Sequence, residues 1–288
     1  MNVIDAILVV YLLASFPIGV YLFARKKVNW SGLEDMVSKY RWHLLMLLCL
    51  FAFKSLVMSF EVTVEGVLGY DATEFVHSIE GDAVLAVQRA FLSEAMTVAM
   101  GAVYIGSFLF IYVFSFLLFA YSDRFKTASQ LMFMNLVLLL ISIPFYFFAI
   151  VYVTSWPLVN DPGATAVVPG MQALLYNYND QIHGFFTSYD TFNNSFPSMH
   201  VGYPAAILIL LWRKQPGFKG YKIFLGVMVF LISLSIVYLG IHWFVDILGG
   251  LVAAFAAILL AERYSEPFWR RAYKLVRWEW KEEEWRKE

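Results

Sequence analysis

Long apolar segments, each close to the length of a bilayer crossing, most limit how this chain folds. They recur along the sequence and are separated by shorter segments that contain the charged residues. A transmembrane helix needs about 20 apolar residues. We place such segments at residues 3–23, 42–60, 97–121, 128–153, 199–212, 221–241 and 244–260. The pattern predicts an all-α, polytopic integral membrane protein with about seven transmembrane helices.

The composition agrees with this class and excludes several functions. Hydrophobic residues make up 60% of the 288 residues and charged residues only 15%, whereas a soluble domain has about 25% charged residues. The net charge is −1 and no basic stripe is present, so nothing indicates a nucleic-acid partner. Cys49 is the single cysteine, which excludes an intrachain disulfide and a cysteine metal cluster.

The distribution of Lys and Arg predicts the orientation in the membrane. These residues gather between the first and second, third and fourth, and fifth and sixth apolar segments and in the C-terminal tail, whereas residues 154–199 contain none. Cytoplasmic segments have the excess of Lys and Arg. We therefore expect a cell-membrane protein with its C-terminus in the cytoplasm. The first segment is interpreted as a span, because its positive charges follow it rather than precede it as in a signal peptide.

The chain divides into a transmembrane domain, residues 1–265, and a tail, residues 266–288. Trp269 and Tyr273 stand four residues apart in the tail, Trp280 follows, and basic residues lie between them. This spacing predicts an amphipathic helix. Its aromatic stripe either lies along the inner membrane surface or packs against the protein's own loops, and the sequence does not favour one of the two.

Polar residues stand at the ends of two apolar segments, where they are costly unless they have a function. Ser198 precedes the fifth segment and His200 lies in its first turn, while His242 and Asp246 stand four residues apart at the start of the seventh. The fifth and sixth segments together cross the membrane twice. His200 and His242 should therefore lie at the same face, which the charge distribution predicts to be extracytoplasmic.

These residue types suggest phosphate chemistry. We expect Asp246 to hold one ring nitrogen of His242 and to leave the other as a nucleophile. Ser198 should cap the fifth span, whose free backbone N–H groups then bind phosphate. His200 is placed to protonate a leaving-group oxygen. The alternative is a pair of helix-capping histidines without any chemistry.

Two motifs carry a resemblance to a known family. The sequence Pro197-Ser-Met-His200 resembles the Pro-Ser-x-His motif of the type 2 phosphatidic acid phosphatase (PAP2) superfamily. Residues 235–246 resemble its Ser-Arg-(x5)-His-(x3)-Asp motif, and the similarity extends over about residues 140–262. The resemblance implies a PAP2-like helical core, a phosphohistidine intermediate on His242, His200 as the acid and base, and neither a metal nor another cofactor.

A finer resemblance concerns the acceptor of the phosphoryl group. Phe196 and Met199 in the first motif are more similar to the branch that contains inositol phosphorylceramide synthase than to the phosphatases. Enzymes of that branch transfer the group to a lipid hydroxyl instead of water. The resemblance thus implies a membrane lipid phosphotransferase that binds a phospholipid. The alternatives are a lipid phosphate phosphatase and a non-enzymatic lipid-binding protein on a degenerate fold.

Two departures from the family pattern remove expected cations. Ile236 stands at the position of the motif arginine, and no Lys-(x6)-Arg-Pro motif is present, Trp156-Pro157 being the nearest sequence. A phosphoryl group still needs positive partners. Lys54 and Arg89 are the basic residues of the outer half, so we expect one of them to bind phosphate. The alternatives are a snorkelling side chain for Lys54 and an interfacial salt bridge for Arg89.

The acidic segment that includes Glu61 and Glu80 has two interpretations: a solvated loop, or hydrogen-bond acceptors for a polyol. His77 and His183 lack the neighbouring ligands of a metal site and are interpreted as ordinary loop histidines.

Overall fold

The computed structural model describes residues 3–158, 163, 165–176, 178, 180–189, 192–215 and 217–288. The regular structure of this part of the chain is helical except for two strands of two residues each, β1 (Tyr70–Asp71) and β2 (Ala149–Ile150), which pair in parallel. The helices are α1 (Val3–Ala24), α2 (Trp30–Leu68), α3 (Thr73–Glu80), α4 (Ala83–Phe91), α5 (Glu94–Tyr121), α6 (Phe125–Phe148), α7 (Asp180–Tyr189), α8 (Met199–Lys214), α9 (Lys219–Tyr238), α10 (Phe244–Leu275) and α11 (Glu282–Arg286).

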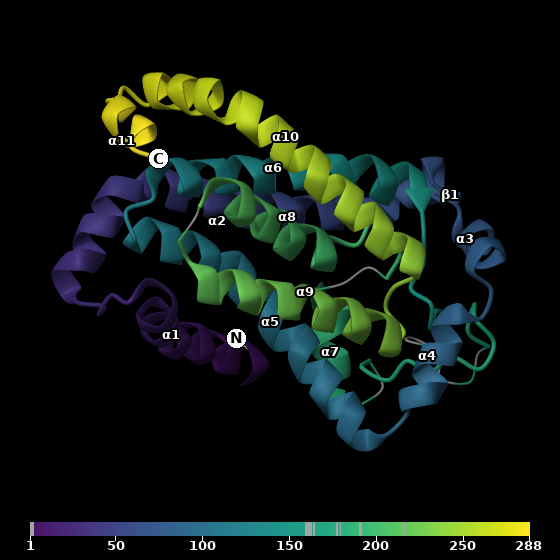
Figure 1. Ribbon diagram of the computed structural model, residues 1–288. Coiled ribbons are helices and arrows are strands. Elements are labelled where there is room, and N and C mark those ends of the chain that lie inside the picture. The colour runs from purple at the N-terminus through teal and green to yellow at the C-terminus, as the bar shows by residue number, and fades with distance from the viewer. Residues whose placement is uncertain are drawn as a thin grey trace.

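Five of the helices in the described part are long and apolar enough to cross a membrane: α5, α6, α9, α10 and the Trp30–Glu61 part of α2. The apolar part of α1 (Val10–Ala24) is shorter, and α8 has 16 residues. These two helices lie where the other two crossings were predicted, and the long helices form one bundle (Figure 1). The predicted all-α, polytopic membrane class is confirmed.

Several element boundaries differ from the predicted ones. The first polar loop is shorter than expected, because α2 already begins at Trp30 and contains Lys39 and Arg41. Leu, Lys, Met, Glu and Arg are good helix formers, so charge alone does not end a helix. At the other end of the chain, α10 continues through Pro267 to Leu275, across the position where the tail was predicted to begin.

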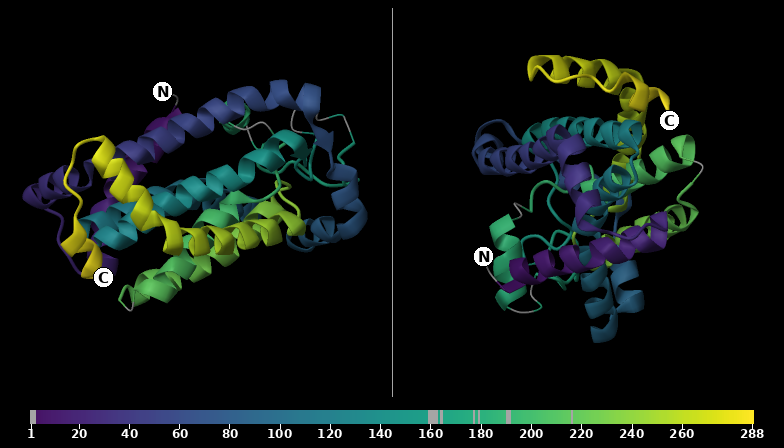
Figure 2. Two further views of the ribbon diagram at one scale, coloured as in Figure 1. Left: turned by 90° about the horizontal axis from the view of Figure 1, so that it is seen from above. Right: turned by 90° about the vertical axis from the view of Figure 1, so that its left-hand side faces the viewer.

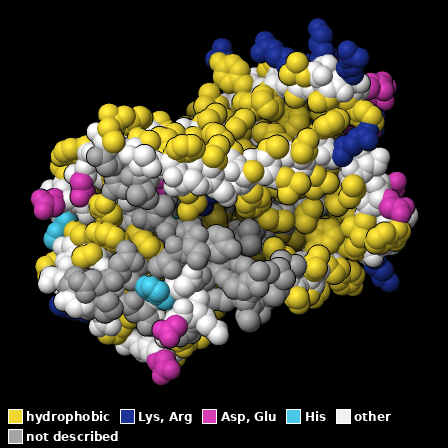
Figure 3. Space-filling view, turned by 180° about the vertical axis from the view of Figure 1, so that it is seen from behind, with side chains coloured by type: hydrophobic (Ala, Val, Ile, Leu, Met, Phe, Trp, Pro, Cys, Tyr) yellow, Lys and Arg dark blue, Asp and Glu magenta, His cyan; other side chains and the backbone are white. Residues whose placement is uncertain are grey.

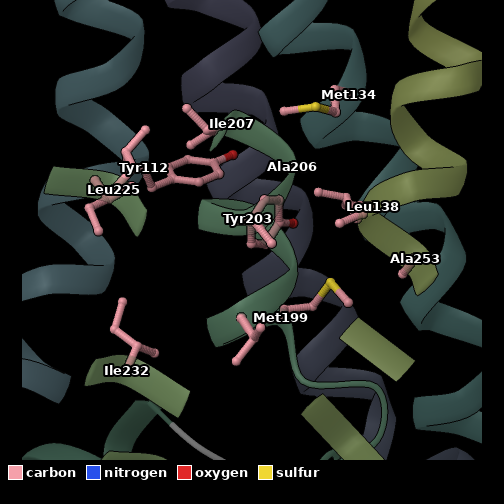
Figure 4. Close-up of a cluster of buried hydrophobic side chains, with 14 of the residues drawn as sticks. Tyr112, Met134, Leu138, Met199, Tyr203, Ala206, Ile207, Leu225, Ile232 and Ala253 are labelled. Carbon is pink, nitrogen blue, oxygen red and sulfur yellow. The ribbon is translucent and has the colours of Figure 1, made fainter. Parts of the chain in front are cut away.

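Helix α8 lies in the centre of the bundle and packs against α5, α6, α9 and α10. Figure 4 shows side chains of these helices around Tyr203 and Ala206 of α8, with Ala253 on the facing turn of α10. Small residues let the backbones of α8 and α10 approach closely. At the closest point, a Cβ atom added to Gly250 of α10 would lie 2.3 Å from the carbonyl oxygen of Ser198.

The two ends of the bundle contain different elements. The left view in Figure 2 shows long helices running in a common direction. Helices α3 and α4 lie at one end, near the start of α10, and α11 lies at the other (Figure 1). At this second end, Glu288 accepts hydrogen bonds from the backbone N–H groups of Lys126 and Thr127, the first turn of α6.

The aromatic stripe of the tail packs against the protein. Trp269 and Tyr273 are 2% and 1% exposed. Trp269 stacks on His43 of α2, with ring centroids 4.0 Å apart, and its indole N–H donates to the carbonyl oxygen of Ser129 in α6. Of the two interpretations that the sequence allowed, packing against the protein holds for these two side chains, although their partners are helices rather than loops.

Candidate active site

A tight turn after α9 positions His242. The backbone N–H groups of Ile241 and His242 both donate to the carbonyl oxygen of Ile236, in the last turns of α9. Gly240 has a φ angle of 83°, which glycine adopts readily, and a Cβ atom there would lie 2.8 Å from the carbonyl oxygen of Gln172. The turn places His242 two residues before α10, where it is 4% exposed.

Asp246 fixes the orientation of this imidazole. Its side chain is completely buried, and its Oδ2 atom lies 3.1 Å from Nδ1 of His242 and accepts the backbone N–H of Trp243 at 2.8 Å. Ser195 donates its hydroxyl to the same Oδ2 atom at 2.5 Å and lies 3.0 Å from Nδ1 of His242. An acceptor at Nδ1 places the proton there and leaves the lone pair on Nε2.

His200 lies on the other side of this ring. Its Nδ1 atom is 3.1 Å from Nε2 of His242. The His200 ring also packs against Tyr104 and Phe108 of α5, with centroid separations of 4.8 and 4.7 Å. The structure therefore brings His200, His242 and Asp246 together in one chain of polar contacts, as expected from the two crossings that separate the histidines in the sequence.

The two helices that begin at the site have different N-termini. The first N–H groups of α10 are bound by carboxylates, because Glu80 of α3 accepts from Phe244 at 2.9 Å and also from Val245. In α8, by contrast, the backbone N–H groups of Met199, His200 and Val201 have no acceptor within the described residues. A helix N-terminus with free N–H groups attracts anions, so the start of α8 can attract an anion whereas that of α10 already has its carboxylate.

Ser198 is the N-cap residue of α8, but it does not cap the helix in the predicted way. Its hydroxyl makes no capping hydrogen bond and has no partner in the described structure. Its backbone N–H donates to the carbonyl oxygen of Asp246 at 2.9 Å and so joins α8 to α10. The amides without an acceptor are thus those of the three residues that follow Ser198 in the described structure.

Glu80 is held between α3 and the site. Burial raises the pKa of its carboxyl group, the N–H groups of Val245 and Phe244 lower it, and the nearby charge of Asp246 raises it, with a net increase. His77, one turn earlier in α3, lies with its ring centroid 5.8 Å from that of Trp243. Helix α3 therefore packs against the segment that contains His242 and holds it in place.

Lys54 faces the same region from α2. It lines a crevice of about 50 Å³ together with Tyr203 and with Phe108, whose ring packs against His200. No ion-pair partner for Lys54 is present among the described residues. A lysine in a membrane span is expensive unless it lines a polar cavity or binds a ligand.

Arg89 lies elsewhere, on α4. A Cβ atom added to Gly170 in the long loop would be 2.9 Å from its Nη2 atom, and within the described structure Arg89 contacts neither site histidine. Ile236, at the position of the motif arginine, is completely buried in the core. Of the two predicted cations, only Lys54 lies beside the histidine pair.

Ser195 and Glu80 contribute to the geometry, yet their roles were not found from the sequence. Ser195 stands three residues before Ser198 in a loop, and a polar residue close to the motif is the signal that the sequence offered. Glu80 belongs to the acidic segment, but nothing in the sequence shows that α3 folds back onto α10. In the described part of the chain, no three or more His, Cys, Asp or Glu side chains form a group suited to a metal ion.

Comparison with known proteins agrees with the two motifs. No curated protein and no solved structure matches this chain. The family model of the PAP2 superfamily matches residues 74–260, which is more than half of the 288 residues and includes both motifs. With the helical bundle and the paired histidines, this match shows that the chain belongs to the PAP2 superfamily.

Proposed function

We propose that this protein is a membrane phosphotransferase that moves the phosphate-linked head group of a phospholipid to a lipid hydroxyl by way of a phosphohistidine on His242. Membership of the PAP2 superfamily suggests a lipid phosphatase or phosphotransferase. The observation that carries the proposal is the chain of contacts from Asp246 through His242 to His200 beside the open N-terminus of α8.

The first step forms the phosphoenzyme. Asp246 holds the Nδ1 proton of His242, so the Nε2 lone pair attacks phosphorus as the bond to the leaving oxygen breaks. His200 donates a proton to that oxygen. The imidazolium character that develops on His242 is stabilised by the buried carboxylate.

The second step reverses these roles. The acceptor hydroxyl gives its proton to His200, and its oxygen attacks phosphorus. The N–P bond then breaks and its electron pair returns to Nε2 of His242. Each residue ends in its starting protonation state.

Substrate entry must separate the two rings. In the first step, phosphorus lies about 3 Å from the attacking nitrogen, and the leaving oxygen lies within hydrogen-bond reach of His200, so the two nitrogens stand roughly 6 Å apart. They are 3.1 Å apart in the structure. His242 is held by Asp246 and Ser195, so we assign the movement to His200, whose other described contacts are with aromatic rings.

The phosphoryl oxygens need donors and positive charge. We assign these roles to the first N–H groups of α8, which follow Ser198, and to Lys54. The amide dipoles are fixed before the substrate arrives, which is the arrangement that stabilises a transition state best. Lys54 thereby supplies the positive charge that is missing at position 236, where the family motif has an arginine and this chain has Ile236.

Two features favour a lipid hydroxyl as the acceptor. The first motif resembles the inositol phosphorylceramide synthase-like branch at Phe196 and Met199. The crevice lined by Lys54, Phe108 and Tyr203 is otherwise apolar, and at about 50 Å³ it would have to widen to admit a lipid chain. Transfer to water is the second candidate, because the geometry accepts either oxygen. A non-enzymatic lipid-binding role is the third, and the buried Ile236 favours it.

The expected orientation places this chemistry at the extracytoplasmic face. The loops that contain Lys and Arg join the helices at the end of the bundle away from the histidine pair. By the rule that basic loops stay in the cytoplasm, phospholipid enters from the outer leaflet and the C-terminus is cytoplasmic.

Incubation of detergent-purified protein with phospholipids, one at a time and with or without a lipid alcohol, tests the function. Lipid products and inorganic phosphate are measured. We expect a new phosphorylated lipid that appears only with the alcohol. Release of inorganic phosphate alone would establish the phosphatase alternative. Binding without turnover across the panel would favour the non-enzymatic alternative.

A further inference from the structure

A groove of about 320 Å³ runs along the last turns of α10, at the end of the bundle away from the histidines. Phe133 of α6 and Phe268 of α10 form its base, with ring centroids 5.1 Å apart, and Arg271 and Leu275 also line it. Tyr264 at one edge is 44% exposed, and Leu275 is 84% exposed. The groove is therefore an open apolar channel with one guanidinium at its wall.

The length of α10 places the groove at the depth in the membrane where lipid head groups lie. Twenty residues separate Phe244 from Tyr264, or about 30 Å of helix at 1.5 Å per residue. This length equals the thickness of the hydrocarbon core of a bilayer. Because α10 begins near one membrane surface, its groove lies at the opposite one, where acyl chains meet phosphate groups.

The charges around the groove favour an anion. Arg270 is paired with Glu266 and Glu282, whereas Arg271 and Lys274 have no ion-pair partner within the described residues. Figure 3 shows Lys and Arg side chains in a row along the outer edge of this part of the molecule, above a broad hydrophobic surface. A zwitterionic head group would bring a cation of its own next to these two side chains, whereas a head group of net negative charge brings none.

We propose that this groove binds one phospholipid of net negative charge, with an acyl chain along Phe133 and Phe268 and the head group on Arg271. The site is separate from the histidine pair and does not depend on the proposed reaction. Its ligand is a bound lipid of the opposite leaflet rather than the substrate. Each basic residue near a charged lipid surface contributes about 1 kcal/mol, which corresponds to roughly fivefold in affinity.

Native mass spectrometry of the full-length protein tests the site, with phosphatidylglycerol and phosphatidylcholine of identical chains added in equal amounts. We expect the wild type to retain one phosphatidylglycerol in preference to phosphatidylcholine. Arg271→Gln should retain roughly fivefold less phosphatidylglycerol. Leu275→Glu, at a highly exposed position where the fold tolerates change, places a negative charge beside the acyl chain and should also reduce retention.

Two further variants distinguish binding in this groove from binding elsewhere on the protein. Lys26→Gln removes the same charge from an exposed position between α1 and α2 and should retain the lipid as the wild type does. His242→Ala should also retain it, because the histidine pair lies at the other end of α10. Equal retention of both lipids, unchanged retention in Arg271→Gln, or an equal loss in Lys26→Gln or His242→Ala would overturn the proposal.

Discussion

Replacement of Gly250 by alanine tests how closely α8 and α10 must approach for the site to work. The new Cβ atom would lie 2.3 Å from the carbonyl oxygen of Ser198, whereas ordinary contacts begin near 3.4 Å. The obstacle is backbone, so α8 must retreat by about 1 Å, the difference between these distances. His200 and the first N–H groups of α8 would shift by the same distance relative to His242, away from the positions that the proposed reaction needs beside a phosphoryl group on His242.

A misplacement of about 1 Å can reduce the rate of an enzyme about 100-fold, and we expect a loss of that order in kcat for Gly250→Ala. The control is Gly226→Ala in α9, where an added Cβ atom has no neighbour within 4 Å. Alanine is favoured over glycine in a helix by about 0.5–1 kcal/mol, so Gly226→Ala should raise Tm and keep its activity. Activity and thermal unfolding are measured for both variants. If Gly250→Ala behaves like Gly226→Ala, the tight contact does not position the histidines.

Three other variants test separate parts of the site. Ser195→Ala removes a hydroxyl that donates to the carboxylate of Asp246 beside the nucleophile, and kcat should fall about 10- to 100-fold. The control is Ser233→Ala, which should keep the wild-type kcat because the Ser233 hydroxyl bonds only a backbone carbonyl one turn away in the described structure. Lys54→Met should lower kcat/KM at least tenfold, while Arg89→Gln stays near the wild-type value. Equal effects of the two variants in initial-rate assays would contradict the assignment of Lys54 to the phosphoryl oxygens. Burial raises the pKa of Glu80 above its ordinary 4.5, so ionisation of this carboxyl group lowers the stability of the native wild type as pH rises from 4.5 through the raised pKa. The Tm of Glu80→Gln minus that of the wild type should therefore become more positive across this pH range. A Tm difference independent of pH would be incompatible with this linkage.

The sequence predicted the bundle because bilayer crossings have a fixed length. Apolar runs of about 20 residues identify spans without knowledge of their neighbours. The predicted boundaries differ from those in the structure, since α2 continues through Lys39 and Arg41 and α10 continues through Pro267. A helix in a packed bundle ends where its contacts end, and this information is absent from a local pattern of charges.

The histidine pair was also accessible from the sequence, because the number of crossings between His200 and His242 places them at one face. The distance between the two histidines could not be predicted from the sequence, since it depends on the contact of Gly250 with Ser198. The role of Glu80 depends on the path of α3 between α2 and α4, and no spacing rule predicts that its carboxylate binds the first amides of α10. Tertiary contacts of this kind require coordinates.

The central claim is that His242 becomes phosphorylated, and rapid-quench capture of the intermediate tests it most directly. Detergent-purified protein is mixed with a phospholipid labelled at phosphorus, quenched in alkali, and digested so that the labelled peptide is identified. We predict label on His242 that is stable in alkali and lost in acid, and no label in His242→Ala. Turnover of the lipid by His242→Ala at the wild-type rate, or label on another residue, would contradict the claim.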